Sequence, residues 1–149
     1  MWKGIGNMRK TVLQAASRVT HVAGEVRQSD IHAAAKNGSA FDVLECLNHG
    51  SNINVVDGSG RTAIFIACEC GHESVVRELI DNGADSNLAN RFSTTPLGVC
   101  CNKGHDAVLR ALIMASGIDL ELGNSLSATP LFIAADRGHG RCAMPLALS

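Results

Sequence analysis

The chain has 149 residues, which is enough for one domain or one short solenoid. Its 13 basic residues nearly balance its 14 acidic residues, so its overall charge does not favour nucleic acid or an anionic membrane as a partner. Aromatic residues make up only 3% of the sequence. A membrane-spanning helix needs a run of about 18 apolar residues, and the sequence contains no run of that length. We therefore expect thin, closely packed helices and no transmembrane segment.

Residues 1–28 form an N-terminal extension with several basic residues and no acidic residue before Glu25. Apolar residues such as Trp2, Val12 and Val26 recur in it close to helical spacing. This pattern favours an amphipathic helix that caps the open apolar face of the next unit. An acid-poor, amphipathic start is also typical of a mitochondrial transit peptide, so a targeting segment is the alternative.

From residue 29 onward the sequence repeats. The pairs Gly71-His72, Gly104-His105 and Gly138-His139 are 33 and then 34 residues apart, and Gly38 begins the same series. Each pair is preceded, nine residues earlier, by a threonine: Thr62, Thr95 and Thr129. A period of this length indicates one supersecondary unit that has been copied and stacked.

Each unit is predicted to contain two helices. In the second unit Thr62 can cap the first helix with its hydroxyl group, and Gly71 can end that helix in a left-handed conformation. A second helix over 73–81 has one apolar face that includes Leu79. The same pattern predicts helix pairs at about residues 29–49, 62–82 and 95–116, and a lone helix at 129–138.

The fourth unit is expected to be truncated after His139. Gly140 and Pro145 fall where its second helix would lie, and proline inside a helix destabilises it by about 3 kcal/mol. Residues 29–149 are therefore predicted to hold about three full units and a truncated fourth. Such an end fits either a fragment of a longer repeat protein or a variant terminus.

These motifs closely resemble the ankyrin repeat. The resemblance covers about residues 29–149 and rests on Thr95-Pro96-Leu97, Thr129-Pro130-Leu131, the Gly-His pairs and Gly83-Ala84-Asp85-Ser86-Asn87. It implies an all-α solenoid of stacked helix-turn-helix units with projecting β-hairpin loops. It also implies that the turn histidines form hydrogen bonds at the turn between the two helices of a unit, and that the protein binds other proteins.

The cysteines do not indicate a disulfide framework. Cys68 aligns with Cys101 and Ala135, so cysteine alternates with alanine at small, buried sites. Stacked helices lie about 8–10 Å apart, whereas a disulfide needs Cα atoms within about 7 Å. We expect Cys68, Cys100 and Cys101 to be buried and reduced, as in the cytosol or nucleus.

No catalytic or metal site is predicted. Cys68 with His72, and Cys101 with His105, are four residues apart, but a glycine interrupts the helix before each histidine. The aligned histidines are separated by about one helix diameter, too far to share a zinc ion. Gly58-Ser59-Gly60 lacks the third glycine of a phosphate-binding loop. We therefore expect no enzyme and no cofactor.

The resemblance places a partner-binding surface at the loop tips and on the exposed side of the first helices. The loop-tip candidates are Ser59, Arg61, Arg91, Phe92, Thr94, Ser125, Leu126 and Ala128. The helix candidates are Phe65, Glu69, Cys70, Asn102, Lys103, Phe132, Asp136 and Arg137. Arg91 with Phe92 is the favoured anchor, because arginine and aromatic residues dominate binding hot spots. Alternatively, Phe92 folds back onto the stack and Arg91 is merely solvated.

The functional hypothesis is a non-enzymatic adaptor or scaffold in the cytoplasm or nucleus that binds a protein partner and no nucleic acid. The alternative is an organelle-targeted or membrane-associated ankyrin-repeat fragment of a larger protein, with mitochondria as one location. A third hypothesis is that the chain is modified, since Leu79, Asp85 and Asn87 have the spacing preferred by an asparagine hydroxylase that acts on ankyrin repeats. The sequence does not indicate an oligomeric state.

Overall fold

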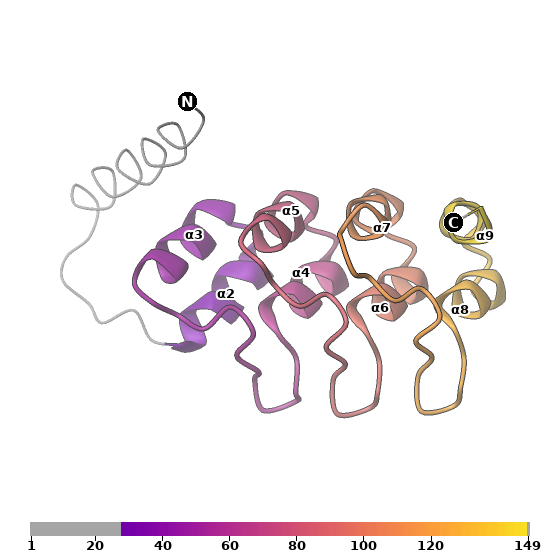
Figure 1. The fold of residues 1–149 in the computed structure, drawn as a ribbon, viewed down its shortest axis with the longest axis horizontal. Helices are drawn as coiled ribbons and strands as arrows, with labels where there is room; N and C mark the ends of the chain where they lie inside the picture. Colours follow the sequence, from indigo (N-terminus) through magenta and orange to yellow (C-terminus); the bar gives the residue numbers. More distant parts are fainter. Residues whose placement is uncertain (1–27, 149) are drawn as a thin grey trace.

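The computed structural model describes residues 28–148. Within this range eight helices form four pairs (Figure 1). The pairs are α2 (Gln28–Asn37) with α3 (Ala40–Asn48), α4 (Ala63–Cys70) with α5 (Glu73–Asp81), α6 (Pro96–Lys103) with α7 (Asp106–Ile113), and α8 (Pro130–Asp136) with α9 (Gly140–Ala147). None of these helices is long and apolar enough to cross a membrane. The predicted cap or targeting segment, residues 1–28, lies outside the described residues apart from Gln28.

The four pairs stack side by side and form two rows of helices. The first helices, α2, α4, α6 and α8, contact one another in succession, and the second helices form the outer row (Figure 1). The hydrophobic core lies between the rows and runs through all four pairs, with Ile64, Leu79 and Leu109 among its fully buried side chains. The predicted helical solenoid is confirmed.

The first helix of each later unit begins at a threonine. The hydroxyl oxygens of Thr62, Thr95 and Thr129 each accept a hydrogen bond from the backbone N–H three residues later, at 3.0 to 3.3 Å. Such caps satisfy one of the orphan N–H groups at a helix start. At the other end α4 and α6 stop at Gly71 and Gly104, whose φ angles are 79° and 77°. Both predicted boundary signals are confirmed.

The turn histidines tie each unit to the one before it. The Nε2 atom of His72 donates to the carbonyl oxygen of Lys36, at 2.9 Å. The same bond joins His105 to Glu69 and His139 to Asn102, at 3.2 and 3.3 Å. The hydrogen bonding implied for these histidines is therefore present, and it acts between units.

Three loops project from the row of first helices (Figure 1). Each is a tight hairpin closed by two backbone hydrogen bonds, for example from the Asn90 N–H to the Thr94 carbonyl oxygen at 2.9 Å and from the Ser93 N–H to the Asn90 carbonyl oxygen at 3.0 Å. Residues 28–148 contain no strand, so these hairpins project without forming a β-ladder. Because the three loops are built alike, their tips form one row along the stack.

The prediction of a lone helix at 129–138 is wrong, since α9 follows α8 and contains Pro145. Gly140 is the first residue of α9, where backbone N–H groups have no partner within the helix in any case. Pro145 removes only one further donor. Cys142 and Leu146 are buried against α8 and α7, so burial in the stack outweighs the weak helix propensity.

The six cysteines all lie within the described residues and form no disulfide; five of them are buried, whereas Cys70 is exposed. The predicted burial of Cys68, Cys100 and Cys101 is confirmed. The thiol of Cys100 donates a weak hydrogen bond to the carbonyl oxygen of Cys68, with a sulfur-to-oxygen distance of 3.8 Å. Here cysteine packs as a small apolar residue between helices of adjacent units.

Candidate protein-binding surface

The loop tips are held in shape by the first side chain of each loop. Residues Asp57, Asn90 and Asn124 occupy this position, and the Oδ1 atom of each accepts two backbone N–H groups from its own tip, at 2.8 to 3.1 Å. Such local bonds fix the conformation of a turn. The tips are therefore organised before any partner arrives.

Two tips hold a serine in the left-handed region. Ser93 and Ser127 have φ angles of 57° and 59°, at the position where the first loop has Gly60. This conformation costs a residue with a side chain about 1–3 kcal/mol and persists where the surroundings fix it. The two backbone N–H groups that donate to the Oδ1 atom of Asn90 restrain the loop that contains Ser93. Asn124 restrains the loop that contains Ser127 in the same way.

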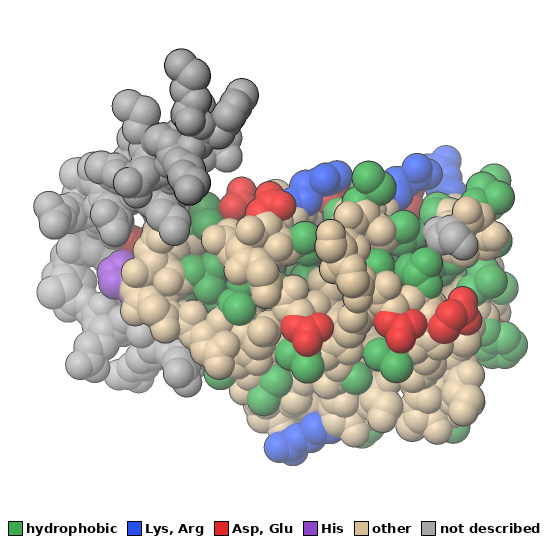
Figure 2. Space-filling model, viewed as in Figure 1, with side chains coloured by type: hydrophobic (Ala, Val, Ile, Leu, Met, Phe, Trp, Pro, Cys, Tyr) green, Lys and Arg blue, Asp and Glu red, His purple; other side chains and the backbone are tan. Residues whose placement is uncertain are grey.

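Arg91 and Phe92 lie together on the middle tip. Phe92 as a residue is 70% exposed, so its side chain does not fold back onto the stack. The backbone N–H of Arg91 donates to the carbonyl oxygen of Ser59 at 3.2 Å, and its side-chain stem lies against Gly60 of the neighbouring loop. Within residues 28–148 the Arg91 guanidinium group makes no ion pair. Figure 2 shows basic side-chain atoms at the edge where the loops project.

The adjoining tip is apolar as well. Leu126 aligns with Phe92 and is 85% exposed, and Ser125 beside it is also exposed. Two large apolar side chains therefore stand at the same position of neighbouring loops. Exposed apolar groups on a polar rim mark interaction sites more often than scattered single residues do.

Arg61 plays a different role from Arg91, because its charge is already paired. Its guanidinium nitrogens lie 2.9 Å from both Asp57 and Glu69. Partial burial would raise the pKa of the Asp57 carboxyl group, but the N–H groups of Arg61 and Ser59, together with the Arg61 side chain, lower that pKa overall. Arg61 and Glu69 therefore brace the first loop against α4.

Phe65 was expected to face a partner, and this expectation is wrong, because its side chain is only 2% exposed. A Cβ atom added at the aligned Gly98 would lie 3.9 Å from the Cδ1 atom of Ile133 in the next unit. This position therefore faces the following repeat rather than solvent. Phe132 holds the same position in the last described unit and is 61% exposed.

The remaining helix candidates lie at the ends of the first helices. Those that are exposed are Cys70, Asn102, Lys103, Asp136 and Arg137. The loop candidates Thr94 and Ala128 are half-buried at the bases of their loops. The structure thus gathers the exposed candidates on the loop tips and on the adjoining ends of α4, α6 and α8.

The cysteine–histidine pairs do not assemble into a reactive site. Burial, with further contributions from Cys100 and Cys142, raises the pKa of the Cys101 thiol to about 12. The ring of His105 is directed away to the Glu69 carbonyl oxygen of the preceding unit. A nucleophilic cysteine needs a thiolate and a base beside it, and this arrangement favours neither. Residues 28–148 also contain no group of three metal-binding side chains.

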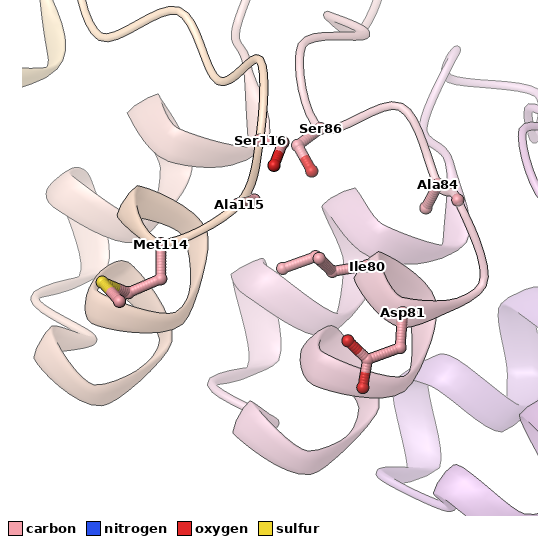
Figure 3. A pocket seen from close by; sticks show the side chains of 8 residues that line it. Ile80, Asp81, Ala84, Ser86, Met114, Ala115 and Ser116 are labelled. Atoms are coloured by element: carbon pink, nitrogen blue, oxygen red, sulfur yellow. The ribbon is translucent and has the colours of Figure 1, made fainter. Parts of the chain in front are cut away.

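The sequence did not reveal a hollow of about 520 Å³ on the outer side of the stack, between the ends of α5 and α7. Figure 3 shows Ile80 pointing into it and Ser86 approaching Ser116 at one side. The turn after α7 lines it, and this turn contains the one residue that the third unit has in excess. This extra residue was the feature of the sequence that could have indicated the hollow.

The side chain of Asn87 bridges two units. Its Nδ2 atom donates to the carbonyl oxygen of Gly117 at 2.7 Å, and its Oδ1 atom accepts the N–H of Asp119 at 2.8 Å. Asn54 accepts the N–H of Asp85 at 2.9 Å in the same way one unit earlier. Modification of the Asn87 side chain would therefore act at a connection between two units.

Comparison with known proteins places the chain among repeat proteins. The family model described as ankyrin repeats (3 copies) matches residues 31–124. Osteoclast-stimulating factor 1 of Sus scrofa is 32% identical over 77 residues, and that of Danio rerio is 34% identical over 77 residues. The Xenopus laevis protein is 35% identical over 75 residues. Each match covers 50% of this chain and 34% of the relative, so the chain spans about a third of the length of these relatives.

Proposed function

Because the chain belongs to the ankyrin-repeat family, we propose that it binds a protein partner through its loop tips and the adjoining ends of α4, α6 and α8. Ankyrin repeats serve as protein–protein interaction modules and are typically not enzymes. Repeat proteins of this kind present extended surfaces whose specificity lies in the exposed side chains, because packing fixes the buried ones. We therefore assign the specificity of binding to the exposed side chains of the loop tips and of the ends of α4, α6 and α8.

The observation that carries this proposal is the pair Arg91 and Phe92. Arginine and aromatic side chains are the residues that most often supply binding energy. Here both stand on a loop that hydrogen bonds already hold in shape, so a partner would lose little free energy in ordering it. The guanidinium group has no acidic partner within residues 28–148, in contrast with Arg61. The complementary partner surface is a carboxylate beside an apolar side chain.

The helix ends extend this surface along the stack. Lys103 and Arg137 add positive charge, whereas Asp136 adds negative charge beside Arg137. A mixed surface of this kind selects among partners and sets the association rate more than it sets affinity. We therefore assign the main binding energy to Arg91, Phe92 and Leu126, and the selectivity to the helix ends.

The test begins with an affinity pull-down that recovers a partner, followed by titration of that partner against variants of the full chain. Truncation of a real hot spot weakens binding by about 2 kcal/mol or more, which is roughly a 30-fold rise in Kd. We expect at least this loss for the double variant R91A/F92A. Its unfolding midpoint should change little, since exposed substitutions alter stability within about 0.5 kcal/mol.

The matched control is the double variant R110A/M114A. It also removes an exposed cation and a large exposed apolar side chain, but from α7 and the turn after it, in the outer row. Its affinity for the same partner should match that of the unsubstituted chain. Unchanged binding by R91A/F92A, or equal loss in both variants, would show that recognition does not depend on the middle loop tip.

A further inference from the structure

Charge is divided unevenly between the N-terminal extension and the helical stack. Residues 1–27 contain five basic residues and one acidic residue, whereas residues 28–148 contain eight basic and thirteen acidic residues. The near neutrality of the whole chain therefore comes from two parts of opposite sign. Such parts attract each other, and the attraction is strongest where the stack carries acidic side chains without basic ones nearby.

One band of the stack carries acidic residues and no lysine or arginine. It comprises residues 78–88 and 112–122, which run from the ends of α5 and α7 toward the next loops, and we call it the acidic strip. Figure 2 shows acidic groups with apolar atoms beside them across the middle of the face drawn there. Within residues 28–148 no ion pair joins a basic residue to the carboxylates of the strip. These carboxylates belong to Glu78, Asp81, Asp85, Asp119 and Glu121.

The acidic strip also offers apolar surface. Leu88 and Leu122 hold the same position in two units and are 36% and 38% exposed. The hollow of about 520 Å³ lies between the two segments of the strip, and Figure 3 shows Ile80 and Asp81 side by side on its α5 side. Pockets that enclose small ligands have about 300–1,000 Å³, so the hollow has room for several side chains. The strip thus combines an apolar recess with a carboxylate at its rim.

We propose that residues 1–27 dock on the acidic strip, with apolar side chains in the hollow between α5 and α7 and basic side chains against the surrounding carboxylates. The segment contains both kinds of residue in close succession, for example Trp2 beside Lys3 and Arg9 near Val12. Removal of the apolar groups from water supplies most of the binding energy, and the complementary charges fix the orientation.

The length of the segment is sufficient for this contact. Stacked helices lie about 8–10 Å apart, so the hollow between the second and third units is about 20 Å along the stack from the first unit. Twenty-seven residues span about 40 Å even when fully helical. Covalent attachment at Gln28 gives an effective concentration in the millimolar range, so a contact that is weak between separate molecules suffices.

Two other arrangements fit the charges less well. A second copy of the stack would bring its own acidic strip against this one, and like charges repel. The first unit is the site that a cap would cover. Residues 28–48 of that unit contain three acidic residues and one basic residue, which is a weaker complement to the extension than the strip is.

This proposal does not rest on the proposed function. The acidic strip ends before the loop tip that carries Arg91 and Phe92, and it uses residues of one chain rather than a separate partner. Loss of the intrachain contact would leave the loop tip in place. Either proposal can therefore fail its test while the other passes.

Trp2 reports on the contact in the full chain, because it is the only tryptophan of the sequence. We expect its fluorescence emission to lie at shorter wavelength in the native protein than in urea, since docking removes the indole from water. The native emission should not depend on protein concentration, because the contact forms within one chain. Native emission equal to that in urea, or a change of native emission with protein concentration, overturns the proposal.

Two matched pairs of variants locate the contact. D81K reverses a charge at the rim of the hollow, whereas D42K makes the same change at an exposed position of α3 in the first unit. A115K places a lysine at a half-buried position that lines the hollow, whereas A107K places one on the exposed side of α7. Circular dichroism checks that each variant is folded.

D81K and A115K should each shift the Trp2 emission to longer wavelength, because the added cation repels the basic segment. D42K and A107K should leave the emission at the wavelength of the unsubstituted chain. An emission that D81K and A115K do not change, while the variants remain folded, shows that the extension does not lie on the strip. A shift in D42K as large as that in D81K overturns the proposal as well, because it assigns the contact to the first unit or to charge alone.

Discussion

The imidazole ring of His105 lies directly over Gly71, where an added Cβ atom would come within 2.9 Å of the ring. Its Nε2 atom donates to the Glu69 carbonyl oxygen at 3.2 Å. Glycine at this position therefore does two things: it ends α4 in a left-handed conformation and leaves room for the histidine of the next unit. The two requirements can be separated experimentally.

Substitution of Gly71 by alanine should destabilise the chain more than substitution of Gly83. Both residues have positive φ angles, 79° and 86°, so each variant incurs the left-handed penalty of about 1–2 kcal/mol. Only at Gly71 would the new methyl group also displace a histidine ring, whereas nothing lies within 4 Å at Gly83. Urea unfolding of both variants measures the difference. Equal losses would mean that the packing of His105 on Gly71 contributes no stability.

Asp57 should give the first loop a pH-dependent contribution to stability. Burial alone would raise its carboxyl pKa, but hydrogen bonds from Arg61 and Ser59 lower it overall. A lowered folded-state pKa means that this contribution is present at neutral pH and is lost as the pH falls through that pKa. The unfolding midpoint of D57A should therefore lie below that of the unsubstituted chain at neutral pH, and the gap should narrow on acidification.

The variant D57N is the matched control for that experiment. Asparagine performs the same capping in the other two loops, at Asn90 and Asn124, so D57N should keep the loop closed. It should nevertheless lose the ion pair with Arg61 and the pH dependence that comes from residue 57. If the unfolding midpoint of D57N changes with pH in the same way as that of the unsubstituted chain, groups other than Asp57 cause the pH dependence.

Thiol labelling of the native protein should modify Cys70 first. Cys70 is exposed, whereas Cys68, Cys100 and Cys101 are fully buried. Burial also raises the pKa of Cys101 to about 12, so almost none of it is thiolate at neutral pH. Mass spectrometry after brief labelling should find one modified site, and the buried thiols should react after unfolding. Fast native labelling of Cys101 would contradict the stacking of α6 against α8.

Substitution of Gly98 by alanine should stabilise the chain. Gly98 lies inside α6, where alanine is favoured over glycine by about 1 kcal/mol. The new methyl group would meet the Thr95 hydroxyl oxygen at 3.3 Å and the Ile133 side chain at 3.9 Å, so part of that gain is offset by a tight contact. We expect a small rise in the thermal unfolding midpoint. A fall would mean that the space beside Gly98 is needed by neighbouring side chains.

The repeat period made most of the fold predictable, because each threonine and glycine signal occurs several times at the same place. Thr62 and Gly71 act locally, on backbone groups within a few residues, so sequence alone locates their helix boundaries. The formation of α9 depends instead on how well Cys142 and Leu146 pack against other helices, which local propensity does not report. Phe65 was misjudged for a related reason: the adjacent unit, rather than the residue type, decides which side of α4 is covered.

The bridges made by Asn54 and Asn87, like those of the turn histidines, reach only from one unit to the next. Under a mechanical load applied along the stack, these connections therefore bear the load in series. Within residues 28–148 the pair α2 and α3 and the pair α8 and α9 each have a neighbour on one side only, so these two pairs should detach at the lowest force. Extension would then proceed one unit at a time, and the order of detachment would follow position along the stack rather than the intrinsic helix propensity of each unit.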